Sequence, residues 1–169
     1  AMKIVLFAFL CLVSVSQASD AVDFLEGLLY GLEKEVSHNL SSCVNEENDM
    51  MKHLQKALTD LEAGIETKNV IKLYEGFENL RKALKEAKVA ISDCGLNELE
   101  SDLENIINKL EQPGGIMEFI KEEEMNIMHH GIVLTIDIKN AINAGKAGDW
   151  HTCGVNVGKI IGILIDKVE

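Results

Sequence analysis

Basic residues are scarce in this chain of 169 residues. It holds 16 lysines and arginines against 28 aspartates and glutamates, for a formal net charge of −12. A surface of this sign repels the phosphate backbone of nucleic acids and anionic membrane surfaces. We therefore expect no nucleic-acid partner.

The sequence also lacks the short motifs that carry common enzyme chemistry. It contains no GxSxG nucleophile elbow, no GxxxxGK[ST] phosphate loop and no GxGxxG dinucleotide loop. It has no HExxH either, and the adjacent His129 and His130 would point about 100° apart on a helix, which suits a metal ion poorly. His151 and Cys153, two residues apart, align no better. We expect no enzyme, no cofactor and no metal site.

Only one long apolar run is present, and it lies at the N-terminus. Lys3 precedes an almost unbroken apolar stretch over residues 4–15, and Ser16-Gln17-Ala18 follows. A positive start, an apolar core of about a dozen residues and a small-x-small site are typical of a secretory signal peptide. The sequence predicts a signal peptide over residues 1–18, a single domain over residues 19–169, a secreted or secretory-lumen location, and no stable membrane insertion once the signal is removed.

Cysteines are few after that signal. Cys43, Cys94 and Cys153 remain, and the secretory route is oxidising, so at least one disulfide is expected. The second and third predicted helices form a hairpin, which returns Cys43 and Cys94 to the same end and predicts that they pair. Cys153 is then an unpaired thiol or a bridge to a second chain. Asn39 opens the NLS sequence, an N-glycosylation signal.

Helical periodicity dominates from Asp20 onward, as in the stripe of apolar residues at three- and four-residue steps that starts at Phe24. The sequence predicts an all-α fold, a bundle of five or six helices. Helices are expected at about 20–36, 44–65, 70–91, 97–110, 116–144 with a kink near residues 129–131, and 150–167. A shift of 80 residues aligns Asn69 with Asp149 and Val70 with Trp150, so the bundle can be read as two pseudo-repeated helical hairpins, or as two amphipathic hairpins that align by chance.

Glycines recur at helical spacing in two places, at Gly27 and Gly31 and again at Gly154, Gly158 and Gly162. Glycine inside a helix costs about 0.5–1 kcal/mol relative to alanine, so a row of them needs a reason. A four-residue period puts them on one face, where another backbone can approach closely. We interpret Gly154, Gly158 and Gly162 as a helix-contact face that serves either packing inside the monomer or contact with a ligand or a second copy.

The segment DFLEGLLYG over residues 23–31 resembles the FLxGxxxG opening of small secreted helical proteins of ciliated protists. The ending Gly148-Asp149-Trp150, followed by Gly154 and Gly158-Lys159, is similar to theirs, and Cys43 and Cys94 fit that pattern. No activity is established for that family, so the resemblance implies a secreted helical protein and no catalytic residues.

The leading interpretation is a secreted, acidic, non-enzymatic helical bundle that acts by binding or by assembly, with self-association among the alternatives. A second interpretation is a carrier that holds a lipid-like or other apolar small molecule between its helices, a role for which flexible methionines such as Met50, Met117 and Met125 are suited. A third is an enzyme of unrecognised type. A carrier requires an apolar cavity, whereas an assembly protein requires an exposed apolar surface.

Overall fold

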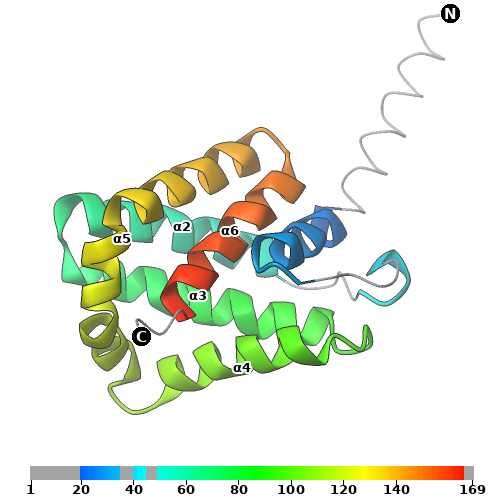
Figure 1. Cartoon of the computed structure of the whole chain (residues 1–169), viewed down its shortest axis with the longest axis horizontal. Coiled ribbons are helices and arrows are strands. Elements are labelled where there is room, and N and C mark those ends of the chain that lie inside the picture. Colours follow the sequence, from blue (N-terminus) through cyan, green and yellow to red (C-terminus); the bar gives the residue numbers. More distant parts are fainter. Residues whose placement is uncertain (1–19, 35–39, 45–48, 166–169) are drawn as a thin grey trace, which may run out of the picture.

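The fold is all-α. The computed structural model describes residues 20–34, 40–44 and 49–165, and within these ranges it contains six α-helices, one short 3-10 helix and no strand (Figure 1). The helix at residues 20–31 is followed by the 3-10 helix η1 (Leu40–Ser42) and by α2 (Met50–Thr67), α3 (Val70–Ala90), α4 (Asn97–Glu111), α5 (Gly115–Lys146) and α6 (Trp150–Ile165). The apolar segment over residues 131–136 is part of α5. The predicted fold class is confirmed.

Helices α2 and α3 form an antiparallel hairpin that carries much of the core. Lys68 adopts a left-handed conformation with φ 52° and ends α2, and the Asn69 side chain caps α3 by accepting hydrogen bonds from the amides of Ile71 and Lys72. A capping asparagine satisfies amides that have no partner inside the helix. Because both signals are local, the hairpin turn was predictable from the sequence.

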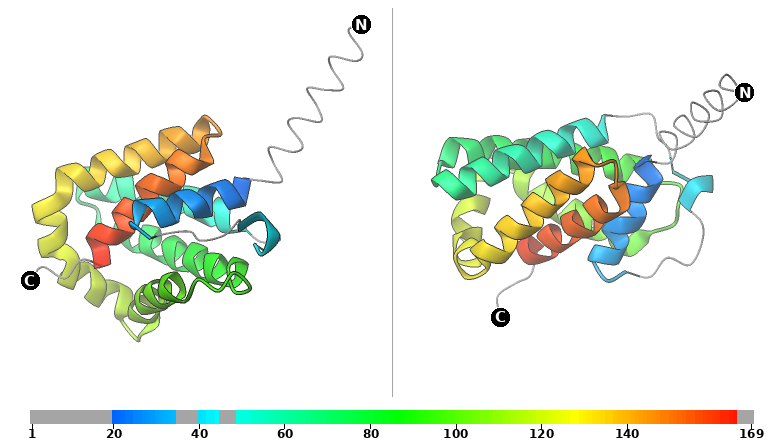
Figure 2. Two further views of the ribbon diagram at one scale, coloured as in Figure 1. Left: turned by 45° about the vertical axis from the view of Figure 1, so that its right-hand side comes forward. Right: turned by 90° about the horizontal axis from the view of Figure 1, so that it is seen from above.

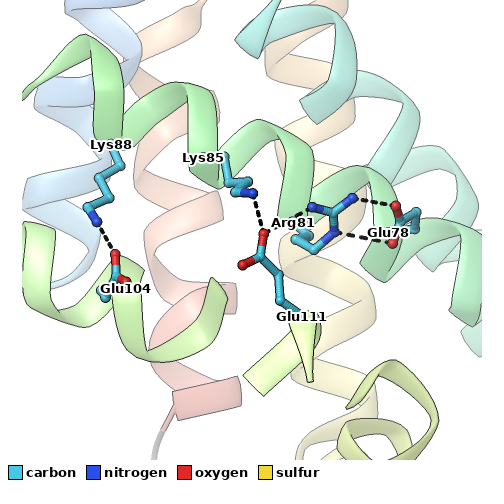
Figure 3. Close-up of polar contacts among 6 residues, drawn as sticks. All are labelled: Glu78, Arg81, Lys85, Lys88, Glu104 and Glu111. Atoms are coloured by element: carbon cyan, nitrogen blue, oxygen red, sulfur yellow. Dashed lines mark hydrogen bonds and ion pairs between the residues drawn. The ribbon is translucent and has the colours of Figure 1, made fainter. Parts of the chain in front are cut away.

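Helix α4 lies against α3, and ion pairs join the two (Figure 3). Arg81 holds Glu78 on its own helix with two hydrogen bonds of 3.2 and 2.5 Å and reaches Glu111 of α4 at 3.2 Å. Lys85 also pairs with Glu111. Further along, Lys88 pairs with Glu104. Apolar residues of α4 lie beneath this row, and all are at most 3% exposed: Leu99, Leu103, Ile106, Ile107 and Leu110.

Helices α5 and α6 form the second hairpin. The long α5 changes direction in its middle part, so that its two halves follow different sides of the molecule (Figure 1). Asp149 caps α6, since its carboxylate accepts hydrogen bonds from the amide and the hydroxyl of Thr152. Asn69 and Asp149 therefore occupy equivalent cap positions in the two hairpins, as the 80-residue shift predicts.

The start of α4 has no side-chain cap. Leu96 occupies the cap position, and no side-chain cap hydrogen bond forms there. Asn97 is already the first helical residue. The Cys94 bridge and the left-handed Gly95 with φ 70° instead set where the chain enters α4.

The helix at residues 20–31 closes the bundle by lying across α6 (Figure 2). Its inward face is fully apolar, with Leu25, Leu28 and Leu29 at most 1% exposed. The core between the hairpins includes an edge-to-face pair of Phe77 and Phe119, with ring centroids 5.1 Å apart.

Candidate functional site

The helix at residues 20–31 and α6 cross with their backbones in close contact, and glycines on both helices make this possible. A Cβ atom on Gly27 would overlap the carbonyl oxygen of His151 and lie 2.9 Å from the Val155 amide nitrogen. A Cβ on Gly154 would overlap the Phe24 carbonyl oxygen and lie 2.8 Å from the Leu28 nitrogen. Neither position can hold a larger side chain without moving the two helices apart.

The two glycine rows found in the sequence thus face each other inside one chain. Gly31 and Gly158 are the second pair of this crossing, whereas a Cβ on Gly162 would meet only the Leu32 side chain at 3.9 Å. Gly162 is therefore not part of the tight backbone contact, and its place in the predicted three-glycine face stays a prediction. The other two glycines serve packing within the monomer, so they are not available to a second copy.

Cys153 lies near this crossing and is 1% exposed. Burial raises the pKa of its thiol to about 12, and the nearby Asp149 carboxylate adds to this shift. A disulfide between two copies would need a thiolate at the surface, and this fold provides neither the exposure nor the charge. The expectation of an intermolecular bridge at Cys153 therefore finds no support in the geometry.

The close crossing leaves a groove along one side of the two helices. Its volume is about 830 Å³, and it is lined by Glu26, Tyr30, Gly31, Glu33, Lys34, His151 and Lys159. Tyr30 is 71% exposed, and its ring centroid lies 6.4 Å from that of His151. Because the glycines bring the backbones together, residues on the outer faces of both helices become neighbours across the groove.

A tight helix end shapes one wall of the groove. Glu33 takes a left-handed conformation with φ 58°, and the Lys34 amide donates to the Leu29 carbonyl at 2.9 Å, which is the geometry of a Schellman turn. The turn directs Lys34 toward α4, where its ammonium lies 3.3 Å from Glu98 and 3.5 Å from Asp102. The hydrogen bond to Glu98 and the charge of Asp102 raise the pKa of Lys34, so it stays charged.

The other cation of the groove, Lys159, comes from α6. Asp137 of α5 is 8% exposed, and burial raises its pKa, while the charge of Lys159 works in the opposite direction. At the start of the first helix, burial likewise raises the pKa of Asp20, and a side-chain hydrogen bond with Trp150 partly offsets this.

The groove itself carries charges of both signs. Two lysines, Lys34 and Lys159, and two glutamates, Glu26 and Glu33, surround the exposed ring of Tyr30, in a protein that is otherwise strongly acidic.

Cys43 and Cys94 are bonded in the structure, with their Cα atoms 5.1 Å apart and a separation of 51 positions in sequence. This is the pairing that the α2–α3 hairpin predicts, because the beginning of α2 and the end of α3 lie at the same end of the bundle. The bridge attaches the segment around η1 to the hairpin. Neither cysteine lines the groove, so the bridge supports the fold.

Several predicted features lie outside the described residues. These are the signal peptide over residues 1–18 and the glycosylation signal at Asn39, which stay predictions. The side chains of residues 122–132 lie outside the described part as well, and with them His129 and His130, weighed as metal ligands, and Met125, weighed as the lining of an apolar pocket. Of the other methionines, Met50 is buried in the core, whereas Met117 is 39% exposed.

Sequence reasoning missed two groupings. Tyr30 and His151 are 121 residues apart, and only the helix crossing brings them together. Asp49, His53 and Glu86 place one ligand-type atom each within 4.8 Å of the others. The spacing of Asp49 and His53 was visible in the sequence, but Glu86 comes from α3. The contact of the His53 Nε2 atom with the Glu86 carboxylate at 3.9 Å accounts for this approach, and we assign no metal to it.

The protein is an all-helical bundle with a disulfide bridge and with open grooves between its helices. The chain belongs to the SctB-like family, described as "Secreted protein B-like", which its residues 12–166 match. It is therefore a secreted, extracellular protein, as the N-terminal sequence predicts. No helix in the part of the chain that the structure describes is long and apolar enough to cross a membrane.

Three relatives from Dictyostelium discoideum are similar to the chain. Secreted protein A is 30% identical over 170 residues, which cover 98% of both chains, and Secreted protein B is 27% identical over 151 residues, which cover 89% of this chain and 82% of that protein. Secreted protein C is 28% identical over 148 residues, and this chain corresponds to only 30% of its length. The resemblance to small secreted proteins holds, but these relatives come from Dictyostelium, and the link to proteins of ciliated protists is not shown. No solved structure matches the chain.

Proposed function

We propose that this protein is a non-enzymatic binding protein of the extracellular space, and that the groove beside Tyr30 is where another polypeptide docks. The observation that carries the proposal is the exposure of Tyr30, which is 71% accessible next to a groove of about 830 Å³. Tyrosine is enriched in protein–protein interfaces and often dominates their binding energy, because its ring buries a large area at little entropic cost.

The charges around the groove support a polypeptide partner. Glu26 on the first helix, Glu33 in the turn that follows it and Lys159 on α6 offer groups of both signs, and His151 adds a second ring. A mixed polar rim around an aromatic centre resembles the anatomy of a non-obligate protein interface. An anionic polymer would instead require a surplus of positive charge, which the groove does not have.

Support for a non-enzymatic role comes from the chemistry of the free thiol and from the relatives. Catalytic cysteines need a lowered pKa, whereas burial raises the pKa of Cys153 to about 12. The names of the three Dictyostelium relatives state secretion and no activity.

The test uses the two tyrosines of the chain, Tyr30 and Tyr74. Each is exposed, and Tyr74, at 44%, lies on α3 away from the groove. Wild type, Tyr30→Ser and Tyr74→Ser are purified from the medium of the cells that make the protein and measured by native mass spectrometry. We expect the wild type and Tyr74→Ser to carry a bound polypeptide that Tyr30→Ser loses.

Two results would contradict the proposal. One is a wild type that carries no polypeptide at all. The other is a complex that survives Tyr30→Ser and dissociates in Tyr74→Ser, which would move the contact surface to the exposed start of α3, where Ile71 is 70% exposed. A complex of twice the mass that depends on Tyr30 would identify the partner as a second copy.

A second candidate function is the apolar carrier. A crevice of about 310 Å³ between α2, α5 and α6 favours it, because its floor is formed by Leu58, Ala141 and Cys153, none more than 2% exposed. This volume lies at the lower end of the range of about 300–1,000 Å³ that small-molecule pockets occupy.

A further inference from the structure

The crevice between α2, α5 and α6 combines a buried, apolar floor with a single charged side chain at its rim. Leu58 and Ala141 provide apolar surface, and the Cys153 thiol beside them is neutral because burial raises its pKa to about 12. The exposed residues Gln55, Thr59 and Lys146 surround the opening. Such a floor favours an uncharged, apolar part of a ligand.

Glycine keeps part of this space open. A Cβ atom on Gly145 would lie 3.3 Å from the Trp150 ring and 3.9 Å from the Cys153 sulfur, so any side chain there would enter the region next to the thiol. Glycine near the end of a helix costs stability relative to alanine. Its presence at a lining position is consistent with a crevice that has to stay open.

The charge of Lys146 indicates which polar group a ligand in this crevice would carry. It is in the last turn of α5, is exposed, and forms no ion pair with another residue in the described ranges. Asp149, which caps α6 three residues further along the chain, is already engaged by the amide and the hydroxyl of Thr152. A ligand with a carboxylate at one end can therefore pair with Lys146 while its apolar body covers the floor.

We propose that this crevice binds a small amphiphilic monocarboxylate, with its apolar chain on Leu58, Ala141 and Cys153 and its carboxylate on Lys146. The proposal rests on the second candidate function and is independent of the groove at Tyr30. A ligand of this class buries its chain without placing a charge on the floor, and it supplies the anion that the unpaired lysine lacks.

Octanoate is the probe, and octan-1-ol and octylamine share its chain with a neutral and a cationic end. Isothermal titration of the full mature protein is expected to show binding of octanoate, weaker binding of octanol and none of octylamine. Lys146→Gln should weaken octanoate binding by about tenfold, because a hydrogen-bonded charge pair is lost. Lys121→Gln, an exposed lysine of the same helix, is the control and should leave binding unchanged.

Blocking the opening tests the location. Thr59 and Thr67 are both exposed on α2, and each hydroxyl donates to the carbonyl four residues earlier, but only Thr59 lines the crevice. Thr59→Trp should abolish octanoate binding, whereas the matched Thr67→Trp should not. Bound octanoate should also slow the alkylation of Cys153, the free thiol of the described chain.

Absence of octanoate binding, or equal loss in both tryptophan variants, would overturn the site. Octanol or octylamine binding as tightly as octanoate, or a Lys146→Gln variant with full affinity, would overturn the ligand class. A protein that loses its polypeptide partner in Tyr30→Ser but still binds octanoate would separate this proposal from the first.

Discussion

The Cα atom of Gly31 lies only 2.9 Å from the position that a Cβ atom on Gly158 would take, which is closer than such atoms normally approach. Two helices far apart in sequence therefore meet backbone to backbone, and every side chain beside this contact takes its position from it. The groove that contains Tyr30 and His151 is one consequence, and the burial of the first helix is another.

The crossing can be tested with two glycines of α6. Gly154→Ala should lower the free energy of unfolding by about 1–3 kcal/mol, because its methyl group would overlap the Phe24 carbonyl and force the helices apart. Gly162→Ala, where only the Leu32 side chain lies within reach at 3.9 Å, should raise it by about 0.5–1 kcal/mol through better helix propensity. Urea denaturation measures both, and a stabilising Gly154→Ala would show that the crossing is looser than described.

The Cys43–Cys94 bridge should contribute much of the stability. Closing a loop of this length is expected to contribute about 4 kcal/mol in the chain-entropy model, and a folded domain has only about 5–15 kcal/mol in total. The double variant Cys43→Ser, Cys94→Ser should therefore unfold at much lower urea concentration. Peptide mapping without reduction checks the pairing directly, and a peptide that joins Cys153 to either partner would contradict it.

Asp137 should make stability depend on pH. Burial raises its pKa in the folded state above the ordinary value of 3.8, so between the two pKa values the folded protein binds more protons than the unfolded chain, and stability falls as pH rises through this window. Asp137→Asn should be more stable than wild type at neutral pH, and the advantage should vanish below the ordinary pKa. Urea titrations across this pH range measure it; a variant less stable at neutral pH would mean that the attraction of Lys159 outweighs the burial.

Asp149→Ala is a control for which the effect on stability at neutral pH is expected to have the opposite sign. Hydrogen bonds from the Thr152 hydroxyl and amide lower the pKa of Asp149, so its contribution is present above its ordinary pKa and is lost as pH falls through the lowered value. The variant should be less stable than wild type at neutral pH and should approach it in acid.

The ion pairs of Figure 3 should each make a modest contribution to the free energy of unfolding, and this contribution should fall as the salt concentration rises. Arg81→Met removes two hydrogen bonds to Glu78 and one to Glu111, and we expect a loss of about 1 kcal/mol that shrinks at high salt. Lys72→Met removes one exposed pair with Glu75 and should cost about 0.3 kcal/mol. Equal and salt-independent losses would show that packing of the arginine stem, rather than charge, holds α3 against α4.

Removal of a signal peptide should leave a chain that begins at or near Ser19. The apolar run over residues 4–15 and the small residues at Ser16 and Ala18 carry this expectation. N-terminal sequencing of the protein from the medium decides it, and a secreted form that still starts at Met2 or Lys3 would refute the cleavage site.

Local chemistry was sufficient for the order and type of the helices. Apolar residues at three- and four-residue steps predicted the inward faces, and the caps Asn69 and Asp149 act within one turn of their own position, so no distant contact was needed to find them. The Cys43–Cys94 pairing followed from the same hairpin, because two helices of known length that turn once must bring their outer ends together.

The sequence showed two rows of glycines but not that they face each other. A four-residue period indicates that the glycines share one face of a helix, but it does not determine which surface packs against that face. The glycine face of α6 could have packed against a second copy or against another helix of the same chain. It packs against the first helix of the same chain, because burial of Leu25, Leu28 and Leu29 holds that helix on α6. The groove at Tyr30 and the crevice at Cys153 were likewise absent from any local pattern. Each is lined by residues of different helices, and only the packing of the whole bundle sets their separation.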